Sequence, residues 1–220
     1  MLSLLARRAH LVDASGLRRL LERHLPYAQL ENAAIPIHIV ASEMVTGGEV
    51  LLSAGPVVDA VLASTAIPGV FPPVRVNGQL LVDGGVANNT PISTAIRLGA
   101  TRIIVLPTGF ACASKQVPAA AIGRAMHALS LLVARQLVQD AERFATAVEL
   151  RIVLSLCPLE CSPYDYSAAG QLIERAAATT RSWLEGGGLE RAGTPMQLQP
   201  HSHLTQQRSE TAPASTRFRC

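Results

Sequence analysis

The chain has 220 residues, of which 49% are hydrophobic and 4% aromatic, and its formal net charge is +3. This length and apolar content suffice for one domain with a sizeable core. Residues 191–220 hold four arginines against one glutamate, so the charge excess lies there and the remainder is neutral. With no basic face and few aromatic rings for base stacking, the composition argues against nucleic-acid binding.

The first elements expected along the chain are a helix, a strand and a second helix. Residues 17–25 have the period of an amphipathic helix, with arginines on the polar side. Residues 35–40, entered through Pro36, form a continuous apolar run of strand length, as expected of a strand buried on both faces. After a Gly-Gly turn, Pro56 suits a first helical position, so a helix is expected over 57–65.

Next comes a hairpin. Residues 74–76 and 79–82 are apolar runs on either side of Asn77-Gly78, a strong signal for a two-residue turn. Asn89-Thr90-Pro91 then provides a capping side chain and a proline at the start of a further helix, which Gly99 ends.

The second half continues the alternation of strands and helices. Strands are expected over 101–106 and 149–156, and helices over 119–147 and 167–185, with three glycines closing the last one. This order predicts an α/β domain over residues 1–188 with a mostly parallel sheet flanked by helices. Residues 189–220 are polar, lack an apolar period and are expected to form a disordered tail.

The motif that points most directly to chemistry is Asp83-Gly84-Gly85, at the carboxyl end of the apolar run Leu80-Leu81-Val82. An aspartate in this position can face a cleft, and the two glycines let backbone or a partner approach closely. Taken alone, the same residues also fit an aspartate that makes a local turn with Asn88 or Asn89.

The surrounding sequence closely resembles the patatin-like phospholipase family. The resemblance is carried by the segment 63–73 (Ala-Ser-Thr-Ala-Ile-Pro-Gly-Val-Phe-Pro-Pro), by Val82-Asp83-Gly84-Gly85-Val86, and by Asn88 and Pro91 in this order and spacing. The stretches from Ile35 to Gly47 and from Leu98 to Val105 fit the same pattern, so the resemblance covers residues 11 to about 185.

The resemblance implies an αβα sandwich and a lipid acyl hydrolase that uses a serine–aspartate dyad, with no cofactor and no metal. The family's serine attacks the ester carbonyl, its aspartate takes and returns the proton, and a glycine-rich loop forms the oxyanion hole. Of these parts only the aspartate carries over, onto Asp83. A Gly-x-Ser-x-Gly nucleophile turn is absent from the chain, so the amino-terminal part of the fold is expected to be missing.

Other candidate residues fit this chemistry poorly. Ser15, Ser42, Ser53 and Ser64 lack the flanking glycines of a nucleophile turn, and Gly186-Gly187-Gly188 follows a helix and fits a helix cap better than an oxyanion loop. Cys157 and Cys161 have no matching second pair for a metal site, and we interpret them as ordinary reduced thiols. Four histidines lack a carboxylate or cysteine partner at ligand spacing: His10, His24, His38 and His127. His201 and His203 lie in the expected tail, and we interpret them as solvated residues.

The sequence therefore predicts a part of a lipid acyl hydrolase that carries the base, Asp83, without the nucleophile, and that is inactive alone. The expected partners are an acyl lipid substrate, a peripheral membrane contact and the missing amino-terminal half. The alternative is a non-catalytic lipid- or protein-binding module that retains the scaffold. Neither a signal peptide nor a membrane-spanning run is visible, so a cytoplasmic location is the default expectation.

Overall fold

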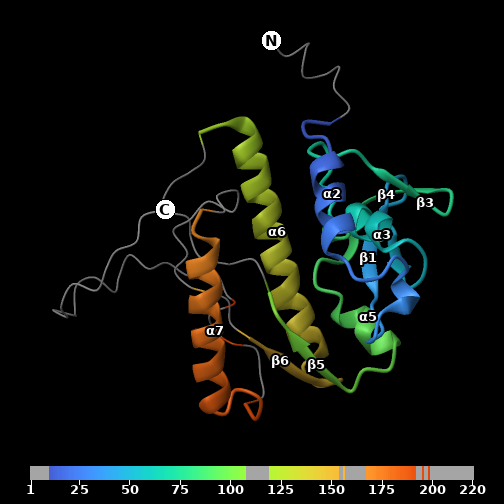
Figure 1. Cartoon of the computed structure of the whole chain (residues 1–220). Coiled ribbons are helices and arrows are strands. Elements are labelled where there is room, and N and C mark those ends of the chain that lie inside the picture. Colours follow the sequence, from blue (N-terminus) through green and yellow to red (C-terminus); the bar gives the residue numbers. More distant parts are fainter. Residues whose placement is uncertain are drawn as a thin grey trace. The chain divides into compact units, whose positions relative to one another are not determined.

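The computed structural model describes residues 10–107, 119–153 and 167–191, together with 156, 195 and 198. The chain divides into two compact units, Met1–Pro91 and Ile92–Cys220. Figure 1 shows the helices and strands of both. The two units are described in turn below, each by itself. The expected polar tail, residues 189–220, lies largely outside the described residues.

The first unit is built on a four-stranded sheet with the order β2-β1-β4-β3. Its strands are β1 (Ile39–Glu43), β2 (Glu49–Leu52), β3 (Val74–Val76) and β4 (Gln79–Asp83), and every pairing among them is antiparallel. Short turns join β1 to β2 and β3 to β4, and connections this short allow only antiparallel neighbours. In the second of these turns Asn77 (φ 50°) and Gly78 (φ 82°) both have positive φ, which confirms the predicted hairpin.

Helices complete the first unit. They are α2 (Ser15–His24), the 3₁₀ turn η1 (Leu30–Asn32), α3 (Val57–Ser64) and the short α4 (Gly85–Asn88). Helix α3 packs on β1, β3 and β4. Together these elements bury an apolar core whose members are almost inaccessible to solvent: Leu30, Ala41, Leu52, Val57, Ala60, Ala63 and Leu81.

The second unit contains the parallel strands of the fold. Strands β5 (Arg102–Val105) and β6 (Glu149–Ile152) pair in parallel, and α5 (Ile92–Arg97) packs on the long helix α6 (Ala121–Phe144). Helix α7 (Ala169–Glu185) follows β6 in the chain. The core of this unit includes Leu198, which is 8% exposed although it falls within the expected tail, along with Ile92, Val105, Leu137, Ala141, Leu150 and Ile152.

The mixed α/β class is confirmed, and three details of the prediction need correction. The expected mostly parallel sheet is wrong for the described strands, because parallel pairing occurs in them only between β5 and β6. The strand expected at 35–40 begins at Ile39 and runs to Glu43, since Ile35 is 76% exposed and Pro36 cannot donate a hydrogen bond. Strand β2 and helix α4 were not predicted.

Candidate active site around Asp83

Asp83 is the last residue of β4 and lies opposite Ala41 of β1. Its backbone N–H donates to the carbonyl of Ala66 (3.0 Å), and the next N–H, of Gly84, donates to the carbonyl of Ser64 (3.3 Å). The last residue of α3 and the residue two positions beyond it therefore hold the Asp83 turn through backbone hydrogen bonds. This contact explains why residues 63–73 and Asp83 belong to one pattern in the sequence: the first supports the turn that carries the second.

Position 84 has no room for a side chain. A Cβ atom at this position would lie 2.2 Å from the backbone oxygen of Val40, closer than any real contact. The backbone of Gly84 has φ −62° and ψ −24°, a conformation that any residue adopts. The glycine therefore permits the start of α4 to sit directly against β1, and conformational freedom plays no part.

The carboxylate of Asp83 is half-buried and held by its own turn. Its Oδ1 atom accepts a hydrogen bond from the Gly85 N–H (2.7 Å), the local aspartate turn that the sequence allowed as an alternative interpretation. Among the described residues no hydrogen bond to Oδ2 occurs, and no fully buried side-chain atom there lacks a partner, so Oδ2 keeps some exposure to solvent. One oxygen is thus fixed and the other remains available to a reacting proton.

Burial raises the pKa of Asp83 above its ordinary value, and the hydrogen bond from Gly85 opposes that rise. No charged side chain in the described part of the chain contributes to the shift. A carboxylate in such a setting binds a proton more readily than one in water. Partial burial therefore suits Asp83 to act as a proton acceptor.

Two side chains that sequence reasoning did not assign hold this region together. Ser42 of β1 is fully buried, and its hydroxyl is hydrogen-bonded to the backbone carbonyl of Asp83 and to the backbone N–H of Ala87 in α4. Asn88 of α4, which the sequence singled out only as part of the pattern, is 8% exposed and donates to Glu49 of β2 (2.6 Å). The sequence did not distinguish Glu49 from an ordinary surface residue, because a glutamate near a glycine turn is common on protein surfaces.

The candidate nucleophiles considered earlier are not brought to the Asp83 carboxylate in the described residues. Ser42 contacts the backbone carbonyl of Asp83, and the Ser53 hydroxyl lies 2.7 Å from the His38 ring nitrogen Nδ1 at an exposed position. Ser64 contributes its backbone carbonyl to the turn. No group of three or more metal-ligating side chains occurs in the described ranges, and Cys157 and Cys161 lie outside them.

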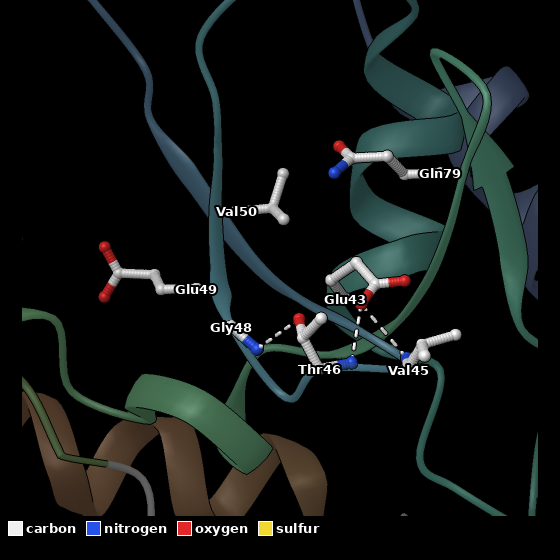
Figure 2. A pocket seen from close by; sticks show the side chains of 7 residues that line it. All are labelled: Glu43, Val45, Thr46, Gly48, Glu49, Val50 and Gln79. Atoms are coloured by element: carbon white, nitrogen blue, oxygen red, sulfur yellow. Dashed lines mark hydrogen bonds between the residues drawn. The ribbon is translucent and has the colours of Figure 1, made fainter.

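A shallow hollow of about 420 Å³ lies next to this region, at the turn between β1 and β2. Figure 2 shows its lining residues: Glu43, Val45, Thr46, Gly48, Glu49, Val50 and Gln79. The carboxylate of Glu43 accepts from the backbone N–H groups of Val45 (3.1 Å) and Thr46 (2.6 Å), so it serves the turn. Asp83 does not line this hollow, and we assign it no chemical role.

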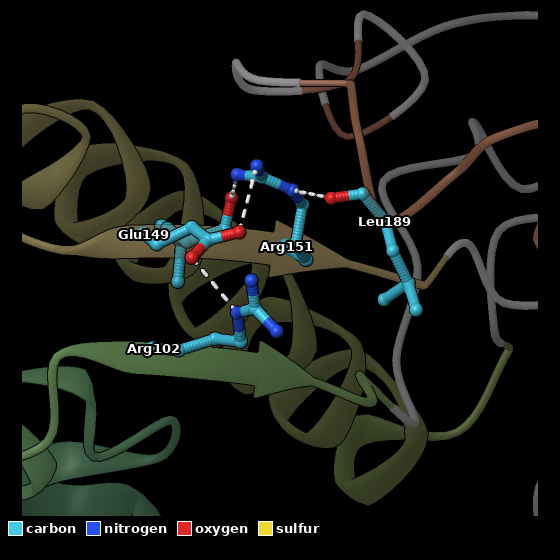
Figure 3. Close-up of polar contacts among 5 residues, drawn as sticks. Arg102, Glu149, Arg151 and Leu189 are labelled. Carbon is cyan, nitrogen blue, oxygen red and sulfur yellow. Dashed lines mark hydrogen bonds and ion pairs between the residues drawn. The ribbon is translucent and has the colours of Figure 1, made fainter.

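The charged cluster of the second unit is structural. Figure 3 shows Glu149 between two arginines, Arg102 of β5 (2.8 Å) and Arg151 of β6 (3.1 Å). The Arg151 side chain is 10% exposed and also donates to the Leu189 carbonyl beyond α7. These contacts connect the parallel strand pair to the residues that follow α7.

With this geometry established, comparison with known proteins gives a family match. A family model described as patatin-like phospholipase matches residues 2–96, a range that contains Asp83, Gly84, Gly85 and all their contacts described above. Residues 2–96 therefore carry the sequence pattern of the patatin-like phospholipase family, a family of lipid hydrolases.

Curated relatives extend the similarity beyond the matched range. An uncharacterized NTE family protein of Mycobacterium tuberculosis is 31% identical over 181 residues, which cover 76% of this chain and 43% of the relative. A counterpart in Mycobacterium bovis gives the same values. A second NTE family protein of Mycobacterium tuberculosis is 50% identical over 52 residues, 24% of this chain and 9% of that protein. The chain thus spans about two fifths of the length of the first relatives.

Every helix within the described ranges is too short or too polar to span a lipid bilayer.

Proposed function

We propose that this chain supplies the proton acceptor, Asp83, of a lipid acyl hydrolase that cleaves ester bonds of phospholipids or other acyl lipids. The observation that carries the proposal is the state of the Asp83 carboxylate: half-buried, fixed through Oδ1, open at Oδ2 and raised in pKa. The patatin-like family match over residues 2–96 supports the same reaction class.

In the proposed reaction, a serine hydroxyl attacks the carbonyl carbon of the ester while Oδ2 of Asp83 takes the hydroxyl proton. The bond from carbonyl carbon to alcohol oxygen then breaks, and Asp83 returns the proton to the departing alcohol. Water attacks the acyl-serine in the same way and releases the fatty acid. Because burial raises the pKa of Asp83, its carboxylate accepts the serine proton more readily than a carboxylate in water would.

The nucleophile of this reaction lies outside the 220 residues, since the chain holds no Gly-x-Ser-x-Gly segment. We therefore expect the chain alone to leave p-nitrophenyl esters and phosphatidylcholine vesicles unhydrolysed. Together with a patatin-like segment that carries Gly-x-Ser-x-Gly, added in trans or joined in frame before Met1, we expect ester hydrolysis.

Substitution of the aspartate tests its role directly. In the combined protein, Asp83→Asn should lower the rate by about 10²–10⁴-fold, the usual contribution of a positioned base. The matched control is Asp59→Asn, which removes a carboxylate of α3 that pairs with Arg18 (2.7 Å) in the same unit. Hydrolysis that survives Asp83→Asn, or hydrolysis by the 220-residue chain alone, would contradict the proposal.

The non-catalytic alternative makes a different prediction in the same assay. A binding module would attach to phosphatidylcholine vesicles, a peripheral contact that the proposal also allows. It would hydrolyse no ester, either as the 220-residue chain alone or in the combined protein. Binding that is insensitive to Asp83→Asn, combined with no hydrolysis in the combined protein, would favour the module and refute the hydrolase.

A further inference from the structure

Ser42 stands out among the polar residues of the first unit, because its side chain is fully buried in the middle of the sheet. It belongs to β1 and lies opposite Val82, the residue before Asp83. A buried hydroxyl costs free energy unless it is hydrogen-bonded. Its partners therefore show what the residue does.

The Ser42 hydroxyl joins the two ends of the Asp83 turn. It donates to the backbone carbonyl of Asp83 (2.8 Å) and accepts from the backbone N–H of Ala87 in α4 (3.0 Å). The same Ala87 N–H also contacts the Gly84 carbonyl (3.1 Å). One hydroxyl thus fixes the end of β4 and the first turn of α4, the two points between which the Asp83 side chain emerges.

These bonds exclude a role for Ser42 as the nucleophile. Its hydroxyl proton is directed at a backbone carbonyl, so it cannot be transferred to the Asp83 carboxylate in this arrangement. The side chain is also closed to solvent, and a substrate ester could not reach it.

We propose that Ser42 is a positioning residue for Asp83: it locks the turn so that Oδ1 stays on the Gly85 N–H and Oδ2 stays open. This role rests on the proposed function of Asp83 as a base. Three other contacts already hold the turn, from the carbonyls of Ala66 and Ser64 and from the close approach of Val40. Unlike these backbone contacts, the Ser42 bond is made by a side chain, so a substitution can remove it without altering the backbone.

The test measures Asp83 and does not depend on hydrolysis. The titration of the Asp83 carboxyl is followed by carbon NMR in the full chain, with Asp83→Asn giving the assignment, and amide hydrogen exchange is followed at Ala87. In Ser42→Ala the turn loosens, so water that reaches the carboxyl lowers the pKa of Asp83 while loss of the Gly85 hydrogen bond raises it. Because burial is the larger of the two causes, the pKa should fall toward its ordinary value. Exchange at Ala87 should quicken about fivefold, which corresponds to the loss of about 1 kcal/mol from one hydrogen bond.

Two variants separate positioning from general stability. Ser42→Thr keeps the hydroxyl and should restore the titration, whereas Ser53→Ala removes a serine hydroxyl hydrogen-bonded to His38 beside the same sheet and should change neither measurement. If Ser42→Ala does not fold, Ser42→Cys keeps the size with a weaker hydrogen bond and should shift the titration in the same direction.

The proposal is overturned if Ser42→Ala leaves the Asp83 titration unchanged while exchange rises equally across β1 and β4, because that pattern is loss of stability alone. It is also overturned if Ser53→Ala has the same effect as Ser42→Ala. Failure of the hydrolysis assay would refute the proposed function but leave this titration result intact, so the two failures can be told apart.

Discussion

The close approach of Gly84 to β1 gives a sharp quantitative prediction. In Gly84→Ala the new methyl group would lie 2.2 Å from the Val40 oxygen and 2.9 Å from the Val40 carbonyl carbon, whereas ordinary contact begins at 3.4 Å. The start of α4 and β1 must separate by about 1.2 Å. Both sides of the contact are backbone, so no side chain can rotate away.

The size of the effect follows from three terms. Overpacking of this kind costs about 1–3 kcal/mol, and the bond from the Gly84 N–H to the Ser64 carbonyl loses about 1 kcal/mol of stabilisation. Replacing glycine restricts the unfolded chain and offsets about 0.4–1 kcal/mol. The net expectation is a loss of about 1–3.5 kcal/mol, or about 2–14 °C in Tm for a chain of this size.

Thermal unfolding followed by far-ultraviolet circular dichroism measures this loss. The matched control is Gly16→Ala: Gly16 lies in α2 of the same unit, its added Cβ meets nothing within 4 Å, and its φ is not positive. This control should gain about 0.5 kcal/mol from helix propensity. A Gly84→Ala variant that melts at or above the wild-type temperature would refute the steric argument.

Three further predictions concern single positions. Asp83→Asn should stabilise the chain at neutral pH. Because the pKa of Asp83 is raised in the folded state, the carboxyl favours folding at a pH below its unfolded pKa, and this contribution is lost as the pH rises through the folded pKa. The Tm difference between Asp83→Asn and wild type should therefore shrink on acidification, and a constant difference would contradict the raised pKa. Gly78→Ala should cost about 1 kcal/mol in urea unfolding because φ is 82°, while Asn77→Gly should be neutral, and equal effects would speak against this turn. Gly188→Ala would place a Cβ 2.2 Å from the ring of Trp183, the chain's single tryptophan, so its fluorescence should shift; an unchanged spectrum would disprove the contact.

Local sequence signals predicted most of the elements correctly, because each rests on the chemistry of a few neighbouring residues. Pro56 precedes α3 directly, Asn77-Gly78 forms the hairpin turn, and Gly99 with φ 90° ends α5. The strand pairing was wrong for a different reason. Alternation of strands and helices indicates a parallel sheet only where each connection is a crossover, and β1–β2 and β3–β4 are joined by turns.

For the candidate site, sequence alone identified Asp83 and its two glycines, because an aspartate and glycines in this order are a local pattern. What the glycines do was decided by tertiary structure: Gly84 is set by the distance to Val40, which is remote in the chain. The same holds for Ser42, whose hydroxyl reaches Asp83 across 41 positions, and for the burial that raises the pKa of Asp83. Residue order determined the family pattern, the aspartate and its local hydrogen bond from the Gly85 N–H. Only the packing of distant segments against the Asp83 turn decided how far the carboxylate is buried, since such contacts have no local signature in the sequence.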